Sequence, residues 1–239
     1  MNIALIKAGG VGQRMGATVP KQFIMIQNKP IIIYTLEQFQ MNPSIDEIVV
    51  ICVAGWHDIL RSYAEKFGIT KLTAIVDGGE TSLKSIKNGI VALNKKCSDD
   101  DIILIHDGNR PVINQEIISD VLVQCRIHGS AVAAIPCTDE VMELSDNFFG
   151  AKKFLNRKKL YRIQTPDAYK FNILKKLFDN ATEEQLTNIG ATNTLMINQG
   201  GEVHFAQGSE LNIRLTTQED IIQCTALLRI ENRIENSDE

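Results

Sequence analysis

Short apolar runs alternate with amphipathic helical patterns along most of the chain, and this alternation constrains the fold more than any other feature. The apolar runs have the length of buried strands, and the segments between them space apolar residues near the helical period. This order predicts a mainly parallel sheet with helices on both faces, a Rossmann-like α/β fold. We expect strands at residues 3–6, 48–53, 72–76, 102–105 and 131–135, and helices at 32–40, 56–67, 82–93 and 115–128.

The size and charge of the chain narrow its class. It has 239 residues, 44% of them hydrophobic, so one core and a single domain over residues 1–239 are expected. The net charge of -4 argues against nucleic acid as a partner. The five cysteines and four histidines lack disulfide or zinc spacing, so reduced thiols are expected. No apolar run has membrane length and no basic segment precedes the first one, so we expect no membrane partner and a cytoplasmic location.

The alternation breaks down at residues 137–162, which mix acidic residues, two adjacent phenylalanines and a basic stretch. A segment this long commonly reaches a partner or serves a binding site, so we expect an extended arm or a long β-hairpin. A last helix is expected at residues 218–229, followed by a polar end at 231–239 that frays. A solvated charge run is the favoured interpretation for the lysines of the arm, Lys152, Lys153, Lys158 and Lys159.

A glycine-rich loop, AGGVGQRMG at residues 8–16, follows the first expected strand and precedes Pro20-Lys21-Gln22. Glycines let backbone amides approach an anion, and Arg14 and Lys21 add two positive charges. The loop lacks the ending of a P-loop, and Pro20 interrupts the helix that a dinucleotide fingerprint requires. The carboxyl end of a strand is where open α/β sheets bind ligands, so a nucleotide phosphate site is indicated, with a tight turn as the alternative.

Polar motifs follow other expected strands. Asp107 comes at the end of one strand, where it could hold Mg²⁺ on a nucleotide phosphate or cap the turn before Pro111. Residues 77–85, DGGETSLKS, form a second glycine turn whose amides could contact a base or ribose. Gln164-Thr165-Pro166 and residues 212–217 add polar groups after extended stretches, with simple turns or helix caps as the alternative.

Together these motifs resemble those of the cytidylyltransferases that form CDP-polyols. Members of that family use 2-C-methyl-D-erythritol 4-phosphate or ribitol 5-phosphate as acceptor. The resemblance covers nearly the whole chain, and several motifs in a shared order are far more specific than any one alone. They are the glycine loop with Arg14, Pro20-Lys21-Gln22-Phe23, His106-Asp107-x-x-Arg110-Pro111, Arg157, Gln164-Thr165-Pro166 and Asn212-Ile213-Arg214.

In that family a phosphate oxygen of the acceptor attacks the α-phosphorus of CTP and expels pyrophosphate, with Mg²⁺ or another divalent cation as cofactor. The resemblance implies catalytic roles for Arg14, Lys21 and Arg157. It implies nucleotide binding by Ala8, Gly9, Gly10, Gly12, Gly79 and Ser85. It assigns the metal to Asp107, and the acceptor to Asp107, Arg110, Glu140, Thr165 and Arg214. It also implies a homodimer through the arm, with the acceptor site shared between subunits.

Five features depart from the family pattern. Lys7 stands where an apolar residue or proline is usual, and Ser82 where arginine is common. Gly108-Asn109 replaces a small or apolar pair before Arg110, Glu140 stands where threonine is normal, and Arg214 replaces lysine. The residues that the family uses to bind the nucleotide are largely kept, whereas those that it uses to bind the acceptor are altered. The acceptor therefore stays open between 2-C-methyl-D-erythritol 4-phosphate, ribitol 5-phosphate and a related sugar phosphate. A non-catalytic nucleotide-binding homologue is one alternative, and an NAD-binding dehydrogenase, resting on the glycines alone, is another.

Overall fold

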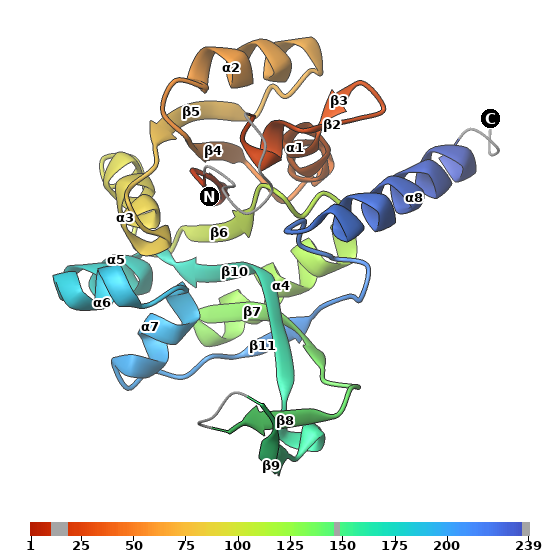
Figure 1. Ribbon diagram of the computed structural model, residues 1–239. Helices are drawn as coiled ribbons and strands as arrows, with labels where there is room; N and C mark the ends of the chain where they lie inside the picture. Colours follow the sequence, from red (N-terminus) through yellow and green to blue (C-terminus); the bar gives the residue numbers. More distant parts are fainter. Residues whose placement is uncertain (11–18, 146–148, 236–239) are drawn as a thin grey trace.

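The computed structural model describes residues 1–10, 19–145 and 149–235, and a seven-stranded sheet forms the centre of this part of the chain (Figure 1). Neighbouring strands run parallel, except that β10 is antiparallel to both β6 and β7. The spatial order is β11 (Phe205–Gln207), β7 (Ser130–Pro136), β10 (Tyr161–Lys170), β6 (Ile102–Asp107), β1 (Asn2–Ala8), β4 (Glu47–Cys52) and β5 (Leu72–Asp77).

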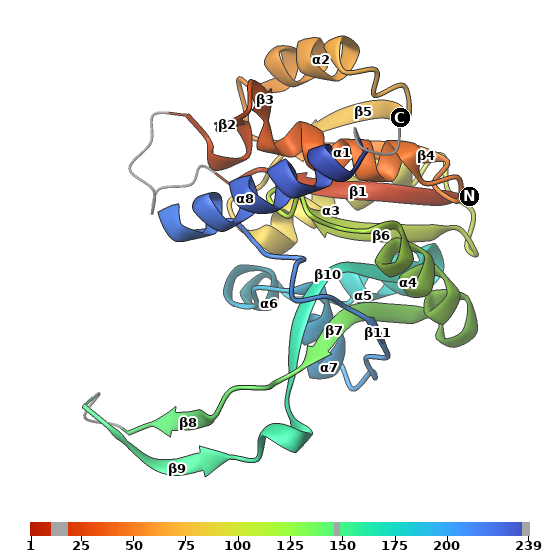
Figure 2. The same cartoon turned by 90° about the vertical axis from the view of Figure 1, so that its right-hand side faces the viewer.

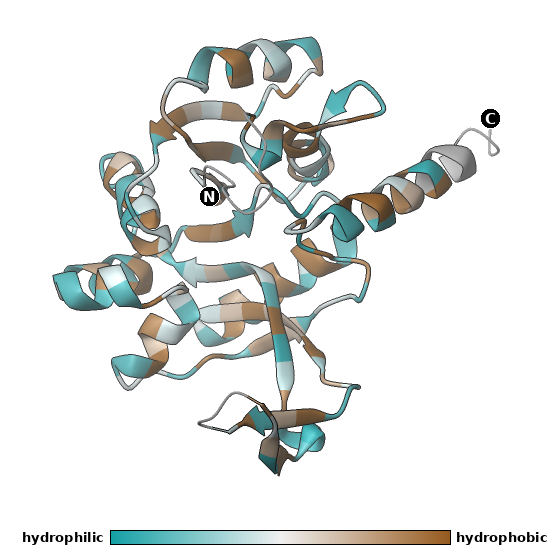
Figure 3. Cartoon of the chain, viewed as in Figure 1, coloured by the Kyte–Doolittle hydropathy of each residue, from teal (hydrophilic) through white to brown (hydrophobic). Residues whose placement is uncertain are grey.

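Helices cover both faces of this sheet (Figure 2). Side chains alternate between the faces along each strand, so in β1 Ala4 and Ile6 join one core while Ile3 and Leu5 join the other. Figure 3 shows the hydrophobic colour along β4 and β6. The first face carries α1 (Ile31–Met41), α2 (His57–Lys66) and α4 (Gln115–His128); the second carries α3 (Ser82–Leu93), α5 (Phe171–Asp179), α6 (Glu183–Asn188) and α7 (Thr192–Asn198).

The strands and helices expected from the sequence are present, and the mainly parallel α/β fold is confirmed. Helices α3 and α4 have the expected bounds because local capping signals define their ends. The Thr81 side chain accepts a hydrogen bond from the Lys84 amide at the start of α3, and Asn114 does the same for Ile117 in α4. Gly129 caps the end of α4 with a φ of 83°, a left-handed conformation that suits glycine.

The last helix is longer than expected. Helix α8 (Gln218–Glu235) passes residue 229, so the expected fraying of the tail is wrong as far as residue 235, and residues 236–239 lie outside the described part. Polar side chains do not end a helix, and residues 218–235 contain neither glycine nor proline. Cys224 and Leu228 anchor the helix in a third apolar cluster with Tyr34 of α1.

The arm contains an antiparallel hairpin of β8 (Val141–Leu144) and β9 (Ala151–Leu155), followed by the short helix η3 (Arg157–Lys159). Figures 1 and 2 both show it extending away from the sheet. Its four lysines are exposed, as expected for a solvated charge run, and the Lys153 ammonium lies 2.7 Å from the Glu143 carboxylate. The expected long hairpin is therefore present, whereas its role in a dimer stays a prediction.

All five cysteines lie in the described part of the chain, and none of them forms a disulfide. Cys52, Cys125 and Cys224 are buried, and Cys97 and Cys137 are half-buried. Among the helices of residues 1–10, 19–145 and 149–235, none combines the length and the apolar composition needed to cross a bilayer.

Candidate active site

The expected site motifs meet where β1, β4 and β6 end side by side. In the pairing of β1 with β6, Lys7 lies opposite Asp107. In the pairing of β1 with β4, Ala8 lies opposite Cys52. The glycine loop and the His106-Asp107 motif are therefore neighbours at the carboxyl edge of the sheet, which is the ligand-binding edge of open α/β folds.

The two glycine turns touch each other across the end of β4. A Cβ atom on Gly9 would lie 3.2 Å from the Cα atom of Gly78, and one on Gly78 would lie 3.1 Å from the Cα atom of Gly9. Ser85 accepts a hydrogen bond from the Gly79 amide at 2.9 Å and donates one to the Thr81 carbonyl at 2.8 Å. The structure thus brings Gly9, Gly79 and Ser85 together, with the Ser85 hydroxyl holding the turn in shape.

Gln22, to which the sequence analysis assigned no role, joins the Lys21 segment to the glycine loop. It lies in the short helix η2 (Lys21–Phe23) and is buried. Its side-chain amide donates to the carbonyls of Ala8 at 2.6 Å and Gly10 at 3.2 Å. These hydrogen bonds hold the segment that carries Lys21 beside the start of the loop. The position of Gln22 next to Lys21 was the only signal available in the sequence.

Phe23 also anchors the segment that carries Lys21. Its ring contacts that of Trp56, with centroids 4.6 Å apart. Trp56 is the one tryptophan in the sequence, so its fluorescence offers a local reporter for the η2 segment. Gly12 and Arg14, the other residues assigned to this loop, lie outside the described residues.

Asp107 lies between two cations. Its Oδ1 atom is 2.9 Å from the Lys7 ammonium, and its Oδ2 atom is 3.2 Å from Nε of Arg110. Burial alone would raise the pKa of Asp107, but Lys7 and Arg110 outweigh it and hold the pKa well below its usual range. Burial alone would lower the pKa of Lys7, but Asp107 and Asp167 raise it above its usual value. Lys7 and Asp107 are therefore both charged at neutral pH.

The acceptor motifs of the sequence converge beside Asp107. Thr165 accepts a hydrogen bond from the Asp107 amide at 3.1 Å, and its carbonyl accepts one from the Asn212 side chain at 2.8 Å. The Arg110 guanidinium donates to the Asn212 carbonyl at 2.6 Å. The structure therefore brings Asp107, Arg110 and Thr165 together. Arg214 is exposed on the same loop, two residues from Asn212.

Two buried titratable groups flank this cluster. Burial lowers the pKa of His106 to about 3, and the ring lies over Phe39 with its Nε2 atom 3.2 Å from the Arg110 carbonyl. Because that carbonyl is an acceptor, the neutral ring donates from Nε2. Burial raises the pKa of Asp167 to about 6, although Lys7 opposes the shift, and the Tyr169 hydroxyl donates to Asp167 at 2.9 Å. Sequence reasoning missed Asp167, whose only signal is its place directly after Gln164-Thr165-Pro166.

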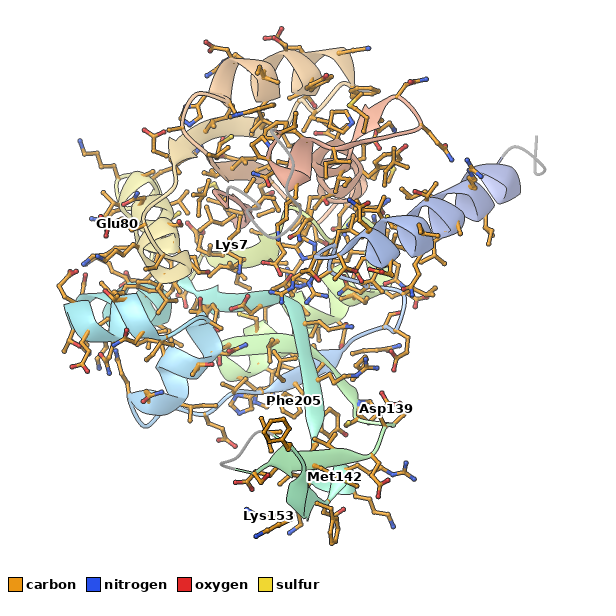
Figure 4. All side chains as sticks on the ribbon, viewed as in Figure 1. Lys7, Glu80, Asp139, Met142, Lys153 and Phe205 are labelled. Atoms are coloured by element: carbon orange, nitrogen blue, oxygen red, sulfur yellow. The ribbon has the colours of Figure 1, made fainter. Side chains whose placement is uncertain are left out.

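The arm residues assigned to the acceptor lie elsewhere. Glu140 and Arg157 line a cavity of about 430 Å³ on the hairpin, together with Lys158 and Phe154. The Arg157 guanidinium donates to the Thr138 carbonyl at 2.6 Å. In Figure 4, Lys7 lies at the centre of the molecule, whereas the hairpin residues Met142 and Lys153 lie far from it. One chain therefore does not bring Arg157 together with Asp107.

The described residues fit a divalent cation with few protein ligands. Within the described ranges, no cluster of three histidine, cysteine or acidic side chains is arranged for a metal. Mg²⁺ commonly uses one or two carboxylates and takes its other ligands from water and substrate phosphates. Each carboxylate oxygen of Asp107 meets one cation and keeps a second lone pair. Asp107 therefore has the capacity to bind an ion carried by a nucleotide.

A mainly parallel α/β sheet with two glycine turns, a nearby lysine and an acid at its carboxyl edge is suited to binding a nucleotide phosphate. A family model described as "IspD: 2-C-methyl-D-erythritol 4-phosphate cytidylyltransferase" matches residues 2–230. The chain belongs to this family of CTP-dependent cytidylyltransferases. The resemblance indicated by the ordered motifs is confirmed, and the cytidylyltransferase class replaces the dehydrogenase alternative.

The individual relatives are named for two different acceptors. A ribitol-5-phosphate cytidylyltransferase of Lacticaseibacillus paracasei is 42% identical over 96% of this chain and 98% of its own. A 2-C-methyl-D-erythritol 4-phosphate cytidylyltransferase of Clostridium acetobutylicum is 34% identical over 96% of this chain and 98% of its own. The crystal structure of 4-diphosphocytidyl-2C-methyl-D-erythritol synthase from Anaerococcus prevotii has a TM-score of 0.79 at 26% identity, covering 96% of each chain.

Proposed function

We propose that the enzyme transfers CMP from CTP to ribitol 5-phosphate, releasing pyrophosphate and forming CDP-ribitol. The observation that carries the use of CTP as donor is the contact between the two glycine turns beside Lys21 and Asp107. The choice of acceptor rests on the relatives. Those named ribitol-5-phosphate cytidylyltransferase in L. paracasei and Vibrio parahaemolyticus are 42% and 38% identical, against 34% for the C. acetobutylicum enzyme named for the methylerythritol acceptor.

The chemistry needs positioning more than a base. An oxygen of the acceptor phosphate, already anionic near neutral pH, forms a bond to the α-phosphorus while the bond to the pyrophosphate oxygen breaks. Backbone amides of the glycine loop and the Lys21 ammonium would offset the charge that develops on the α-phosphate. Mg²⁺, with Asp107 as a ligand, would neutralise phosphate charge and orient the leaving group.

The acceptor site would be completed by the arm of a second copy. Glu140 and Arg157 lie away from Asp107 within one chain. The hairpin exposes large apolar side chains, with Met142 56% exposed and Phe154 71% exposed, which is typical of a surface that another chain covers. A homodimer in which each arm reaches the partner's sheet would bring Arg157 to the acceptor phosphate.

A panel assay tests the acceptor. The enzyme is incubated with CTP, Mg²⁺ and one polyol phosphate at a time, and pyrophosphate release is measured. Ribitol 5-phosphate should give the highest kcat/KM. A higher value with 2-C-methyl-D-erythritol 4-phosphate would overturn the choice of acceptor. CTP binding without release from any acceptor, unchanged in Lys21→Ala, would instead support a non-catalytic homologue.

A mixing experiment tests the shared site. Lys21→Ala and Arg157→Ala should each be nearly inactive, but a heterodimer of the two retains one intact site that combines Lys21 of one chain with Arg157 of the other. Half of the dimers in an equal mixture are heterodimers, so roughly one quarter of wild-type activity should return. No recovery after subunit exchange, verified by mass spectrometry, would show that each site uses one chain only.

A further inference from the structure

Lys7 is a charged residue in an otherwise apolar strand. The other residues of β1 from Ile3 to Ala8 are hydrophobic and buried. Lys7 shares its sheet face with Leu5, and on the same face the neighbouring strands carry Asp107 and Asp167. The three side chains come from β1, β6 and β10, which are consecutive strands of the sheet. Figure 4 shows Lys7 at the centre of the molecule.

The contacts of Lys7 concentrate on Asp107. The side chain of Lys7 is 20% exposed and that of Asp107 is 14% exposed, and their charged atoms are 2.9 Å apart. Arg110 takes the other oxygen of the same carboxylate. The Asp107 group is therefore restrained from both sides, and its orientation depends on both cations. The buried cluster of Lys7, Arg110, Asp107 and Asp167 has two positive and two negative groups, so it is balanced only when Lys7 is present.

Stability alone does not explain a lysine at this position. Removing two charges from water costs about as much as their attraction returns, so an apolar residue often serves a buried position equally well. The benefit of the charge must then lie in what it does to Asp107. Without Lys7, a carboxylate restrained from one side only would face a triphosphate, and the like charges would repel.

We propose that Lys7 is a positioning residue that acts through Asp107, holding this carboxylate in place with its charge compensated so that anionic CTP can bind beside it. The inference rests on the proposed donor site. It assigns to Lys7 a contribution to nucleotide affinity that requires the Asp107 carboxylate and disappears when that carboxylate is removed.

A double-mutant cycle tests the proposal. The dissociation constant of CTP in the presence of Mg²⁺ is measured from Trp56 fluorescence and by calorimetry for wild type, Lys7→Met, Asp107→Asn and the double variant. We expect Lys7→Met to weaken CTP binding about tenfold or more in the wild-type background, equivalent to about 1.4 kcal/mol, and less than twofold in the Asp107→Asn background. Lys7→Arg, which keeps the charge, should recover part of the affinity.

The controls separate the possible failures. Lys175→Met removes a lysine from α5 whose side chain is 44% exposed, and it should leave the affinity for CTP unchanged. If Lys7→Met does not fold, the charge-balanced Lys7→Met/Asp167→Asn variant replaces it and should show the same loss. The proposal would be overturned if Lys7→Met weakened CTP binding equally with Asp107 present and in the Asp107→Asn variant, or if it weakened binding in neither. Failure of the wild type to bind CTP would instead overturn the proposed donor site.

Discussion

The strongest prediction for stability concerns His106, a fully buried histidine in the middle of the site motif. Its ring lies over Phe39, and its Nδ1 atom is buried without a hydrogen-bond partner. Burial lowers its pKa from 6.5 to about 3, because a charged imidazolium would lose its hydration. We therefore expect His106 to be a main contributor to acid destabilisation, and His106→Gln to remove that contribution.

The magnitude follows from proton linkage. A depressed pKa in the folded state means that His106 supports stability fully above pH 6.5 and less as the pH falls toward 3. At pH 4.5 the unfolded chain binds a proton that the folded chain excludes, which costs about 3 kcal/mol. The full cost, reached below pH 3, is about 5 kcal/mol. Glutamine does not titrate, so the variant avoids this loss while all other groups titrate as before.

Urea unfolding at pH 7.5 and pH 4.5 measures the effect. The free energy of unfolding of His106→Gln, taken relative to wild type, should rise by about 3 kcal/mol between the two pH values. An equal loss of stability in wild type and His106→Gln on acidification would refute the linkage argument.

Three further outcomes are expected. Asp167 has a pKa raised to about 6 by burial, so its contribution to stability is present at low pH and is lost as the pH rises through 6. Asp167→Asn should gain about 2.5 kcal/mol relative to wild type between pH 4 and pH 8, measured by urea unfolding, and a constant difference would contradict this. Lys21→Ala should lower kcat about 100-fold with a smaller change in the KM for CTP, because its charge acts mainly as the transition state forms; a pure rise in KM would argue against that role. Glu140→Thr should shift acceptor preference by about tenfold in kcat/KM, and an unchanged acceptor profile would remove Glu140 from the acceptor site.

The central strands could be predicted because a strand buried on both faces needs apolar residues at successive positions, as in β4 and β6. Strand β10 could not be predicted this way. Its ten residues include Pro166, Asp167 and Lys170, and they become a strand only because β6 and β7 pair with them on either side. The missed end of α8 has a different, local cause, since residues 230–235 contain neither glycine nor proline and polar side chains alone do not stop a helix.

By itself, the sequence determined the class of fold, the family and the donor-side residue types, because apolar periodicity, glycine turns and motif order are local properties of a chain. Only the tertiary structure decided the partners of those residues. It placed Lys7 on Asp107 and Gln22 on the carbonyls of the glycine loop, and it set the hairpin apart from the site of the same chain. The physical reason is that strand order and register bring together residues a hundred positions apart, and neither property is written in any local pattern.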